Sequence, residues 1–245
     1  MSFEGASVLV TGGSRGIGKA IATRFAELGA KKIALGYMRN DTAAEGTANE
    51  LLALGAEPVL IRGNVTSDGV LAEVEQQGPW NVLVHNAATG VIRPALETED
   101  KHWDWTLGAN ARALLSLARV AAPTMPEGSS IVGISSLGSI RVLENYILVG
   151  TSKAALESLV RYLAVELAPR GIRVNAVSGG VVETRALEHF PNKDQMLAAA
   201  QTRTPAGRMV TPQDIAGAVS FLCSPESDMV RGQTLIVDGG YSLLA

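Results

Sequence analysis

The sequence predicts an α/β protein with a single-domain, Rossmann-type doubly wound fold, in which a seven-stranded parallel sheet carries helices on both faces. Short aliphatic or β-branched segments alternate with longer segments whose apolar residues recur at helical spacing. The 245 residues include 26 glycines but only 4% aromatic residues, which suits tight strand-to-helix turns around an aliphatic sheet. Such alternation is typical of a parallel sheet with right-handed crossovers.

The elements follow from these patterns in chain order. Seven short apolar segments are expected to be strands, at residues 6–11, 32–37, 58–62, 82–84, 130–135, 173–178 and 234–237. Amphipathic segments between them predict helices over residues 16–28, 42–54, 101–122, 154–167 and 212–222. No repeat or linker divides the chain, so one domain is expected over residues 1–245. The least regular part, residues 182–211, is interpreted as a flap over a pocket, or else as a long surface connection.

Bulk properties narrow the classes of function. A formal charge of −3 and a pI near 5.7 provide no broad basic surface, so nucleic acid is not an expected partner. The single cysteine, Cys223, excludes an internal disulfide and lies in an apolar run. Neither a signal peptide nor an apolar stretch of the ~20 residues that span a bilayer is visible, so we expect a cytoplasmic protein without a membrane partner.

A glycine-rich loop follows the first predicted strand and precedes the first predicted helix. Its sequence, residues 11–18, is Thr-Gly-Gly-Ser-Arg-Gly-Ile-Gly. Glycines allow a tight turn and close approach to a pyrophosphate, and the start of a helix offers unpaired N–H groups. The loop could merely shape a turn, but its place between strand and helix favours a dinucleotide site. Its expected cofactor-binding residues are Gly12, Ser14, Arg15, Gly16, Ile17 and Gly18.

The end of the second predicted strand bears on which dinucleotide is bound. An acidic residue there would accept hydrogen bonds from a ribose 2′-hydroxyl and repel a 2′-phosphate. This chain instead has Arg39, which together with Arg15 could form charge-assisted bonds to the phosphate. The alternative is that both are solvated surface arginines. The pattern favours NADPH over NADH.

Several further motifs resemble those of the short-chain dehydrogenase/reductase superfamily. They are the loop at 11–18, Asn86-Ala87-Ala88, Asn110, Ser135-Ser136, Lys153 and the closing segment 231–240. The resemblance covers essentially the whole chain. It implies additional cofactor contacts at Asn64, Val65, Asn86, Ala87, Ala88, Lys153, Gly180, Val182 and Thr184. Two positions depart from the family pattern, because Asn64 replaces a commoner aspartate and Gly179 replaces a common proline.

The position of the tyrosine narrows the resemblance. Most members have a tyrosine four residues before the lysine, but here that residue is Val149, and the nearest tyrosine is Tyr146, seven residues before Lys153. On an ideal helix seven residues return within roughly 20° of the starting direction, with a rise of about 10 Å, so the two side chains can share a face. This spacing, with residues 102–105, 134–146 and 175–180, looks most like bacterial enoyl-acyl-carrier-protein reductase III.

The resemblance implies a reaction. We expect NADPH-dependent reduction of the 2,3 double bond of an enoyl thioester, with Tyr146 stabilising the enolate oxygen and Lys153 holding the nicotinamide ribose. Ser136 could orient Tyr146 or satisfy backbone groups, and Asn110 could support a network near Lys153. One alternative is reduction of a 3-oxoacyl or other carbonyl substrate; another is a catalytically silent NADPH-binding regulator.

The sequence leaves the partners partly open. The acyl thioester could be carried on acyl carrier protein or on CoA, and neither chain length nor pathway follows from the residues. The family resemblance also suggests a homotetramer. His85, His102 and His189 are not spaced as metal ligands, so a metal cofactor is not expected.

Overall fold

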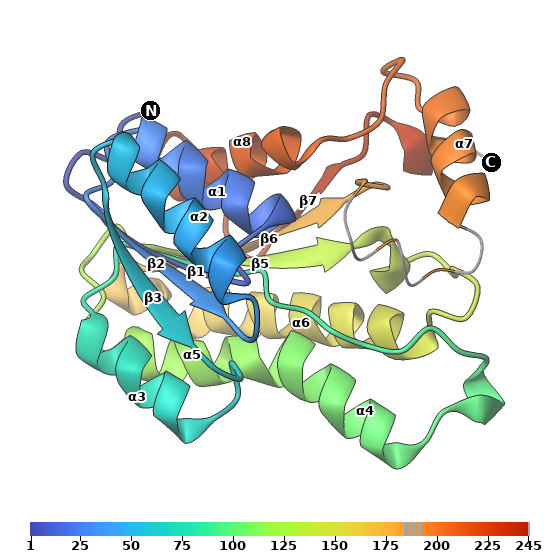
Figure 1. Cartoon of the computed structure of the whole chain (residues 1–245), viewed down its shortest axis with the longest axis horizontal. Helices are drawn as coiled ribbons and strands as arrows, with labels where there is room; N and C mark the ends of the chain where they lie inside the picture. The colour runs from blue at the N-terminus through green and yellow to red at the C-terminus, as the bar shows by residue number, and fades with distance from the viewer. Residues whose placement is uncertain (184–186, 188–189, 191–192, 245) are drawn as a thin grey trace.

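The computed structural model describes residues 1–183, 187, 190 and 193–244. Within them all seven strands are parallel and form one sheet in the order β3-β2-β1-β4-β5-β6-β7 (Figure 1). The strands are β1 (Ser7–Thr11), β2 (Lys32–Tyr37), β3 (Glu57–Arg62), β4 (Val82–His85), β5 (Ser130–Ser136), β6 (Arg173–Gly179) and β7 (Thr234–Val237). The predicted fold class is confirmed, and every strand boundary differs from the predicted one by at most one residue.

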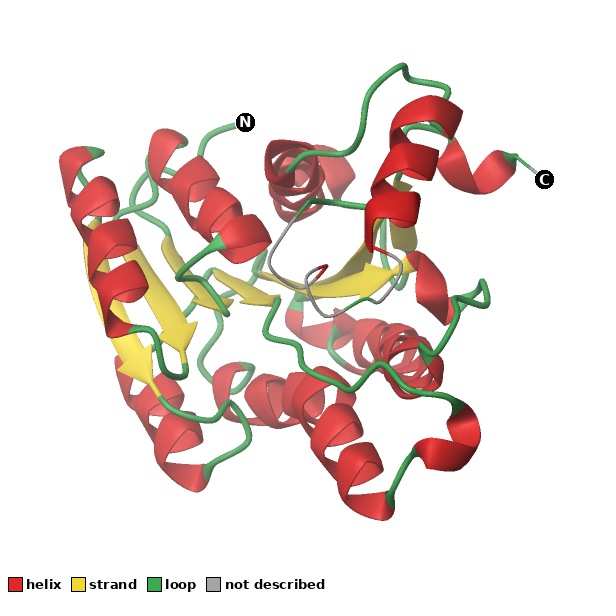
Figure 2. Ribbon diagram, turned by 45° about the vertical axis from the view of Figure 1, so that its right-hand side comes forward, coloured by secondary structure: helices red, strands yellow, loops and turns green. Residues whose placement is uncertain are grey.

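Helices cover both faces of the sheet (Figures 1 and 2). One face carries α1 (Gly16–Glu27), α2 (Asp41–Ala53) and α8 (Pro212–Cys223); the other carries α3 (Asp68–Gln77), α5 (Ala113–Ala121) and α6 (Ile147–Glu166). The alternation of side chains along β1 explains this arrangement. Val8 and Val10 belong to the core under α1 and α8, whereas Leu9 belongs to the core under α5 and α6.

One helix prediction was right in its extent but missed an internal turn, and another was wrong about where the helix begins. The predicted helix at 101–122 is divided into α4 (Asp100–Leu107), a π-helical turn (Gly108–Arg112) and α5, because the turn places Asn110 for contacts with a distant loop. Helix α6 begins at Ile147 rather than at residue 154. Its N-cap, Tyr146, makes no side-chain capping hydrogen bond, so the usual polar start signal is missing.

The segment at residues 182–211 contains more regular structure than its composition predicts. Helix α7 (Lys193–Arg203) lies inside it, and Val182 forms a parallel bridge with Val210.

None of the helices among the described residues is long and apolar enough to cross a membrane.

The register of the sheet brings the ends of its strands to one edge. Thr11, the last residue of β1, pairs with Gly36 of β2 on one side and with His85 of β4 on the other. The strand order reverses between β1 and β4, since β2 and β3 lie on one side of β1 and the later strands on the other. Open α/β sheets bind ligands in the crevice beside such a reversal.

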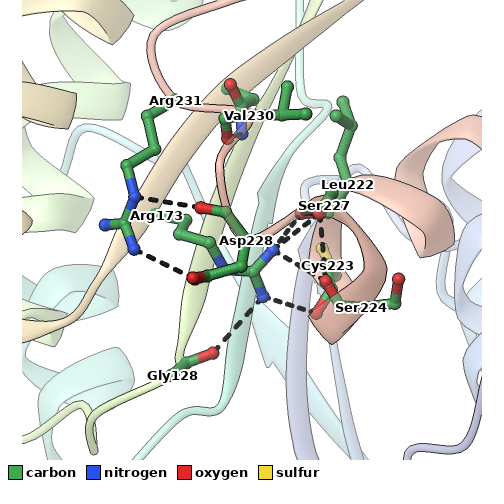
Figure 3. Close-up of polar contacts among 10 residues, drawn as sticks. Gly128, Arg173, Leu222, Cys223, Ser224, Ser227, Asp228, Val230 and Arg231 are labelled. Carbon is green, nitrogen blue, oxygen red and sulfur yellow. Dashed lines mark hydrogen bonds and ion pairs between the residues drawn. The ribbon is translucent and has the colours of Figure 1, made fainter.

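A buried arginine fastens β6 to the end of α8 (Figure 3). The Arg173 side chain is 3% exposed, and its guanidinium donates hydrogen bonds of 2.9 Å to three main-chain carbonyls and one of 2.7 Å to the Ser227 hydroxyl. The three carbonyls belong to Leu222, Cys223 and Ser224. Carbonyls at a helix C-terminus lack partners within the helix. Arg173 supplies a donor to the Cys223 carbonyl and shares the Leu222 and Ser224 carbonyls with Ser227.

Replacing this arginine should destabilise the fold strongly. We expect Arg173→Met to lower the free energy of unfolding by about 3 kcal/mol, because four buried charge-assisted hydrogen bonds are lost and the Cys223 carbonyl loses its donor. Arg231→Met is the matched control, since Arg231 makes a more exposed ion pair of 3.1 Å with Asp228 beside the same site and should change stability by less than about 1 kcal/mol (Figure 3). Urea unfolding would measure both variants, and equal losses would contradict the assignment.

Candidate active site at the carboxyl ends of the strands

The glycine-rich loop is folded too tightly for side chains at two of its glycines. A Cβ at Gly18 would lie 2.1 Å from the carbonyl oxygen of Gly12, and one at Gly12 would lie 2.8 Å from the Asn86 amide nitrogen. Gly12 also has a φ of +65°. The loop leads into α1, whose N-cap, Arg15, supplies no side-chain cap and whose first turn has no acidic residue. The helix start therefore offers unpaired N–H groups and a positive dipole end, which fit a phosphate.

Side chains from two other segments hold this loop in shape. The Asn86 Nδ2 donates hydrogen bonds of 3.1 Å to the carbonyls of Thr11 and Gly12. On the other side, Thr47 Oγ1 of α2 donates to the carbonyl of the buried Ser14 at 3.0 Å. Ile17 is half-buried in the first turn of α1. The loop is therefore braced before any ligand binds.

A buried histidine connects the loop after β4 with the π-helical turn. Thr11 Oγ1 accepts hydrogen bonds from the backbone N–H groups of Asn86 and Ala87, at 3.1 and 3.0 Å, and lies 3.1 Å from His85 Nδ1. Because Thr11 Oγ1 accepts both, its own proton points to Nδ1, and His85 Nε2 carries the hydrogen donated to the Asn110 carbonyl at 3.2 Å. Burial, aided by the charge of Lys153, lowers the pKa of His85 to about 3, so the ring is neutral.

The fully buried Asn110 side chain links the loop after β4 to α6. Its Oδ1 accepts from the Thr89 N–H at 2.8 Å, while its Nδ2 donates to the Thr89 carbonyl at 2.8 Å and to Ser152 Oγ at 2.9 Å. Ser152 in turn donates to the Val149 carbonyl at 2.7 Å. Both amide hydrogens of Asn110 are thus engaged by protein groups, which ties the loop after β4 to α6.

Ser136 and Tyr146 meet where β5 ends and α6 begins. Ser136 Oγ accepts a hydrogen bond from the Gly138 N–H at 3.2 Å. Burial raises the pKa of Tyr146, and a side-chain hydrogen bond with Ser136 opposes that rise. The tyrosine ring also packs 5.5 Å from the ring of Phe190, measured between centroids. A phenol that stays protonated next to a hydroxyl is suited to donate a hydrogen bond or a proton.

Lys153 lies on α6, seven residues after Tyr146, and is almost fully buried. Its Nζ donates to the Ile134 carbonyl of β5 at 2.7 Å. Burial lowers the pKa of Lys153 to about 8, and the charge of Glu157 opposes this effect. The ammonium form is therefore still the main form at neutral pH.

The position that usually holds the tyrosine in the superfamily is occupied here by a buried valine, Val149. Val149 is 8% exposed, and a Cβ added to Gly90 would lie 2.4 Å from its Cγ2. The Val149 side chain therefore lies against the loop that follows β4. No hydroxyl is available at this place, so Tyr146 is the phenol at the site.

Two arginines lie near the proposed phosphate site, which is formed by the glycine-rich loop and the start of α1 and is called the cradle below: Arg15 lies in the loop, and Arg39 follows β2. Arg15 and Arg39 are both exposed, and neither has an acidic partner within the described part of the chain. Asp41, the first acidic residue after β2, accepts a hydrogen bond of 3.0 Å from the Tyr37 hydroxyl and lies 3.4 Å from an Arg62 nitrogen. The carboxylate of Asp41 is therefore already paired, and the positive charge of Arg39 at the end of β2, without an acidic partner among the described residues, suits a phosphate.

The remaining predicted contacts are placed as follows. Asn64 is exposed and its Oδ1 accepts from the N–H and hydroxyl of Thr66, at 3.1 and 3.0 Å, while Val65 is half-buried. The Gly180 N–H donates to the Val237 carbonyl at 2.9 Å, and Val182 is buried. Ala88 follows Asn86 and Ala87 in the loop after β4. Thr184 lies outside the described residues.

Three residues at the site were not among the predicted ones. His85 ends an otherwise apolar strand, and Glu157 follows Lys153 by four residues, so both had a signal in the sequence. Phe190 had none, because its contact with Tyr146 joins segments 44 positions apart. Among the described residues no group of three His, Cys, Asp or Glu side chains is arranged to hold a metal ion.

Comparisons with known proteins agree with this geometry. The sequence profile of the family described as Enoyl-(Acyl carrier protein) reductase matches residues 12–242. 1-cyclohexenylcarbonyl-CoA reductase of Streptomyces collinus is 38% identical over 97% of this chain and 87% of its own length. D-erythrulose reductase of Gallus gallus is 34% identical over 98% of this chain and 97% of its own length. The structure of the Bacillus cereus enoyl-acyl carrier protein reductase with NADP+ and indole naphthyridinone has a TM-score of 0.92 at 29% identity and covers all of both chains.

The neutral state of His85 predicts a pH-dependent stability. The folded pKa is depressed to about 3, whereas an unfolded histidine titrates near 6.5, so below that pH only the unfolded state takes up the proton. At pH 5 this should cost about 2 kcal/mol of stability relative to pH 8. We expect His85→Asn to remove that component in urea unfolding at the two pH values. His102→Asn is the control and should retain the native dependence; equal curves for His85→Asn and the native protein would refute the assignment.

Proposed function

The chain belongs to the short-chain dehydrogenase/reductase superfamily, and from this premise we propose that it reduces the 2,3 double bond of an enoyl thioester with NADPH. The superfamily makes it an oxidoreductase. The observation that carries the finer proposal is the placement of the phenol: Tyr146, at the start of α6, lies beside Ser136, whereas the usual position is the buried Val149. The 38% identical relative is named for reduction of a CoA thioester whose double bond is conjugated with its carbonyl.

The chemistry of conjugate reduction gives a reason for a displaced phenol. In ketone reduction the acceptor carbon bears the oxygen that needs a proton. In conjugate reduction the hydride reaches the β-carbon while charge develops on the thioester oxygen, roughly 2–4 Å farther away at ordinary bond lengths. A donor that serves that oxygen should therefore lie farther from the hydride than in a ketone reductase. Tyr146, three residues before the usual position, provides such a donor.

Each residue around the phenol has a distinct role in the proposed reaction. Tyr146 donates to the developing enolate oxygen, and Ser136, whose hydroxyl lies beside the phenol, orients Tyr146. The Lys153 ammonium adds positive potential beneath the site and, as the family resemblance implies, would bind the nicotinamide ribose hydroxyls. Asn110 positions α6 against the loop after β4 through Ser152 and Thr89.

The cradle residues fit NADPH. Gly12 and Gly18 leave the space that a pyrophosphate needs, and the start of α1 offers donors to it. Arg15 and Arg39 would bind the 2′-phosphate. When bound, the nicotinamide supplies the hydride for the β-carbon.

Carbonyl reduction is the second candidate, because D-erythrulose reductase is 34% identical over nearly the whole chain. The Ser136–Tyr146 pair could equally protonate a carbonyl oxygen. The two reactions differ in which substrate is turned over, so one assay distinguishes them.

Removing the phenol should abolish most of the enoyl reduction. We expect Tyr146→Phe to lower kcat on crotonyl-CoA or a longer 2-enoyl-CoA by about 100-fold or more, followed as NADPH oxidation at 340 nm. NADPH binding should persist. Tyr162→Phe is the matched control, because Tyr162 lies on the same helix with its side chain exposed.

A 3-oxoacyl thioester run in parallel decides between the candidates. Turnover of the 3-oxo substrate alone would refute enoyl reduction and support the carbonyl reductase. Tyrosine-dependent turnover of the enoyl substrate alone would support the first proposal.

The choice of cofactor depends on Arg39. We expect Arg39→Ala to weaken NADPH binding by about 10- to 100-fold, because a charge-assisted contact to the 2′-phosphate is lost, and to leave NADH binding nearly unchanged. Fluorescence titration with both cofactors measures this. Arg24→Ala, in the last turn of α1, serves as the control for loss of a surface arginine. An unchanged preference between the two cofactors would show that Arg39 is only a solvated residue.

A further inference from the structure

A buried carboxylate next to the site has no role in the reaction described above. Glu157 on α6 is 9% exposed, and its Oε1 accepts hydrogen bonds from Ser135 Oγ at 2.5 Å and from Ser139 Oγ at 2.6 Å. The two serines lie on either side of Ser136, one directly before it and the other three residues after it. The carboxylate therefore holds both flanks of the turn that presents Ser136.

Lys153 lies one helical turn before Glu157, on the same side of α6. The Lys153 Nζ binds the carbonyl of Ile134, and Glu157 binds the hydroxyl of Ser135, the next residue of β5. Two oppositely charged side chains of one helix thus fix two successive residues of the strand that ends in Ser136. Residues four apart on a helix are neighbours on its surface.

The groups that face Lys153 come from several elements. Burial favours the neutral amine, and the negative charge of Glu157 opposes it. From β4, His85 also interacts with Lys153, but its ring is neutral and adds no positive charge. Tyr146, at the start of α6, is a protonated phenol at neutral pH. Glu157 is therefore the group whose charge favours the ammonium.

From these contacts we propose that Glu157 is a positioning residue: its carboxylate braces the turn from Ser135 to Ser139, so that Ser136 stays beside Tyr146, and it places a negative charge one helical turn from the Lys153 ammonium. The inference rests on the roles given to Lys153 and Ser136 in the proposed function. The competing interpretation is a structural fastening of α6 to β5 that leaves the charge of Lys153 unaffected.

Glu157→Gln separates charge from shape. The amide oxygen of glutamine can still accept from both serine hydroxyls, so the variant deletes the charge while the acceptor remains. The NADPH dissociation constant would be measured by fluorescence between about pH 5.5 and pH 10, together with kcat on the enoyl thioester. We expect the alkaline midpoint of both profiles to move down by about one pH unit, because a neighbouring negative charge near a buried lysine is lost. Well below that midpoint, NADPH binding should be close to native.

Two matched variants act as controls. Glu166→Gln makes the same chemical change at an exposed position on α6, about 20 Å along the helix from Lys153 at 1.5 Å per residue, and should leave both midpoints unchanged. Ser139→Ala removes one hydroxyl but keeps the carboxylate, so it should lower kcat with the native alkaline midpoint. Glu157→Asp keeps the charge on a shorter side chain and should stay near the native midpoint; it provides the comparison if the glutamine variant folds poorly.

Each outcome decides the matter. If Glu157→Gln binds NADPH with the native pH dependence, the inference is overturned, and a lower thermal midpoint alone would then identify a structural fastening. If Glu157→Gln does not fold, a native alkaline midpoint in Glu157→Asp supports the inference, whereas a midpoint lowered by about one unit despite the retained charge overturns it. If no enoyl thioester is turned over but the midpoint of NADPH binding still moves, the proposed substrate is wrong while the role of Glu157 stands.

Discussion

The parallel pairing of β1 with β4 is the constraint on which the site depends. Because Thr11 and His85 are paired in register at the ends of these strands, the two loops that follow them emerge side by side. Their polar groups then satisfy one another: the Thr11 hydroxyl takes two N–H groups from the second loop, and the Asn86 amide donates to two carbonyls of the first. Buried backbone groups need such partners, so the crevice at the reversal of strand order is already formed in the fold itself.

Two basic side chains are buried near each other behind this crevice, and burial acts on both. It lowers the pKa of His85 to about 3 and that of Lys153 to about 8. The histidine can remain neutral because each of its nitrogens has a fitting partner, Thr11 on one side and the Asn110 carbonyl on the other. The lysine retains its proton at neutral pH, with Glu157 one turn away. Neutrality at one position thus reduces the cost of a charge at the other.

The sequence predicts the sheet much better than the helices around the site. Strand boundaries agree within one residue, because the short continuous apolar run of a buried parallel strand is a local signal. The division of the helix at 101–122 depends on Asn110 reaching Thr89, 21 positions away, and no local pattern contains that contact. Ser136, Tyr146 and Lys153 could be selected by spacing and resemblance. Glu157 stands four residues after Lys153, but its contacts with serines 22 and 18 positions earlier follow from no local pattern.

The position of the phenol is determined by local packing as well as by helical spacing. A Cβ added to Gly90 would lie 2.4 Å from Val149 Cγ2, so the loop after β4 packs closely against the side chain at residue 149. At the helix start the space is provided by Gly138, where a Cβ would lie 2.5 Å from the Tyr146 ring, and by Gly150, where a Cβ would lie 2.6 Å from the Gly138 carbonyl. A ring at position 146 therefore needs glycine at position 138, and the backbone of Gly138 in turn needs glycine at position 150. The displaced tyrosine, the two glycines and the buried valine form one packing arrangement, so the position of the phenol is fixed by the backbone at the junction of β5 and α6.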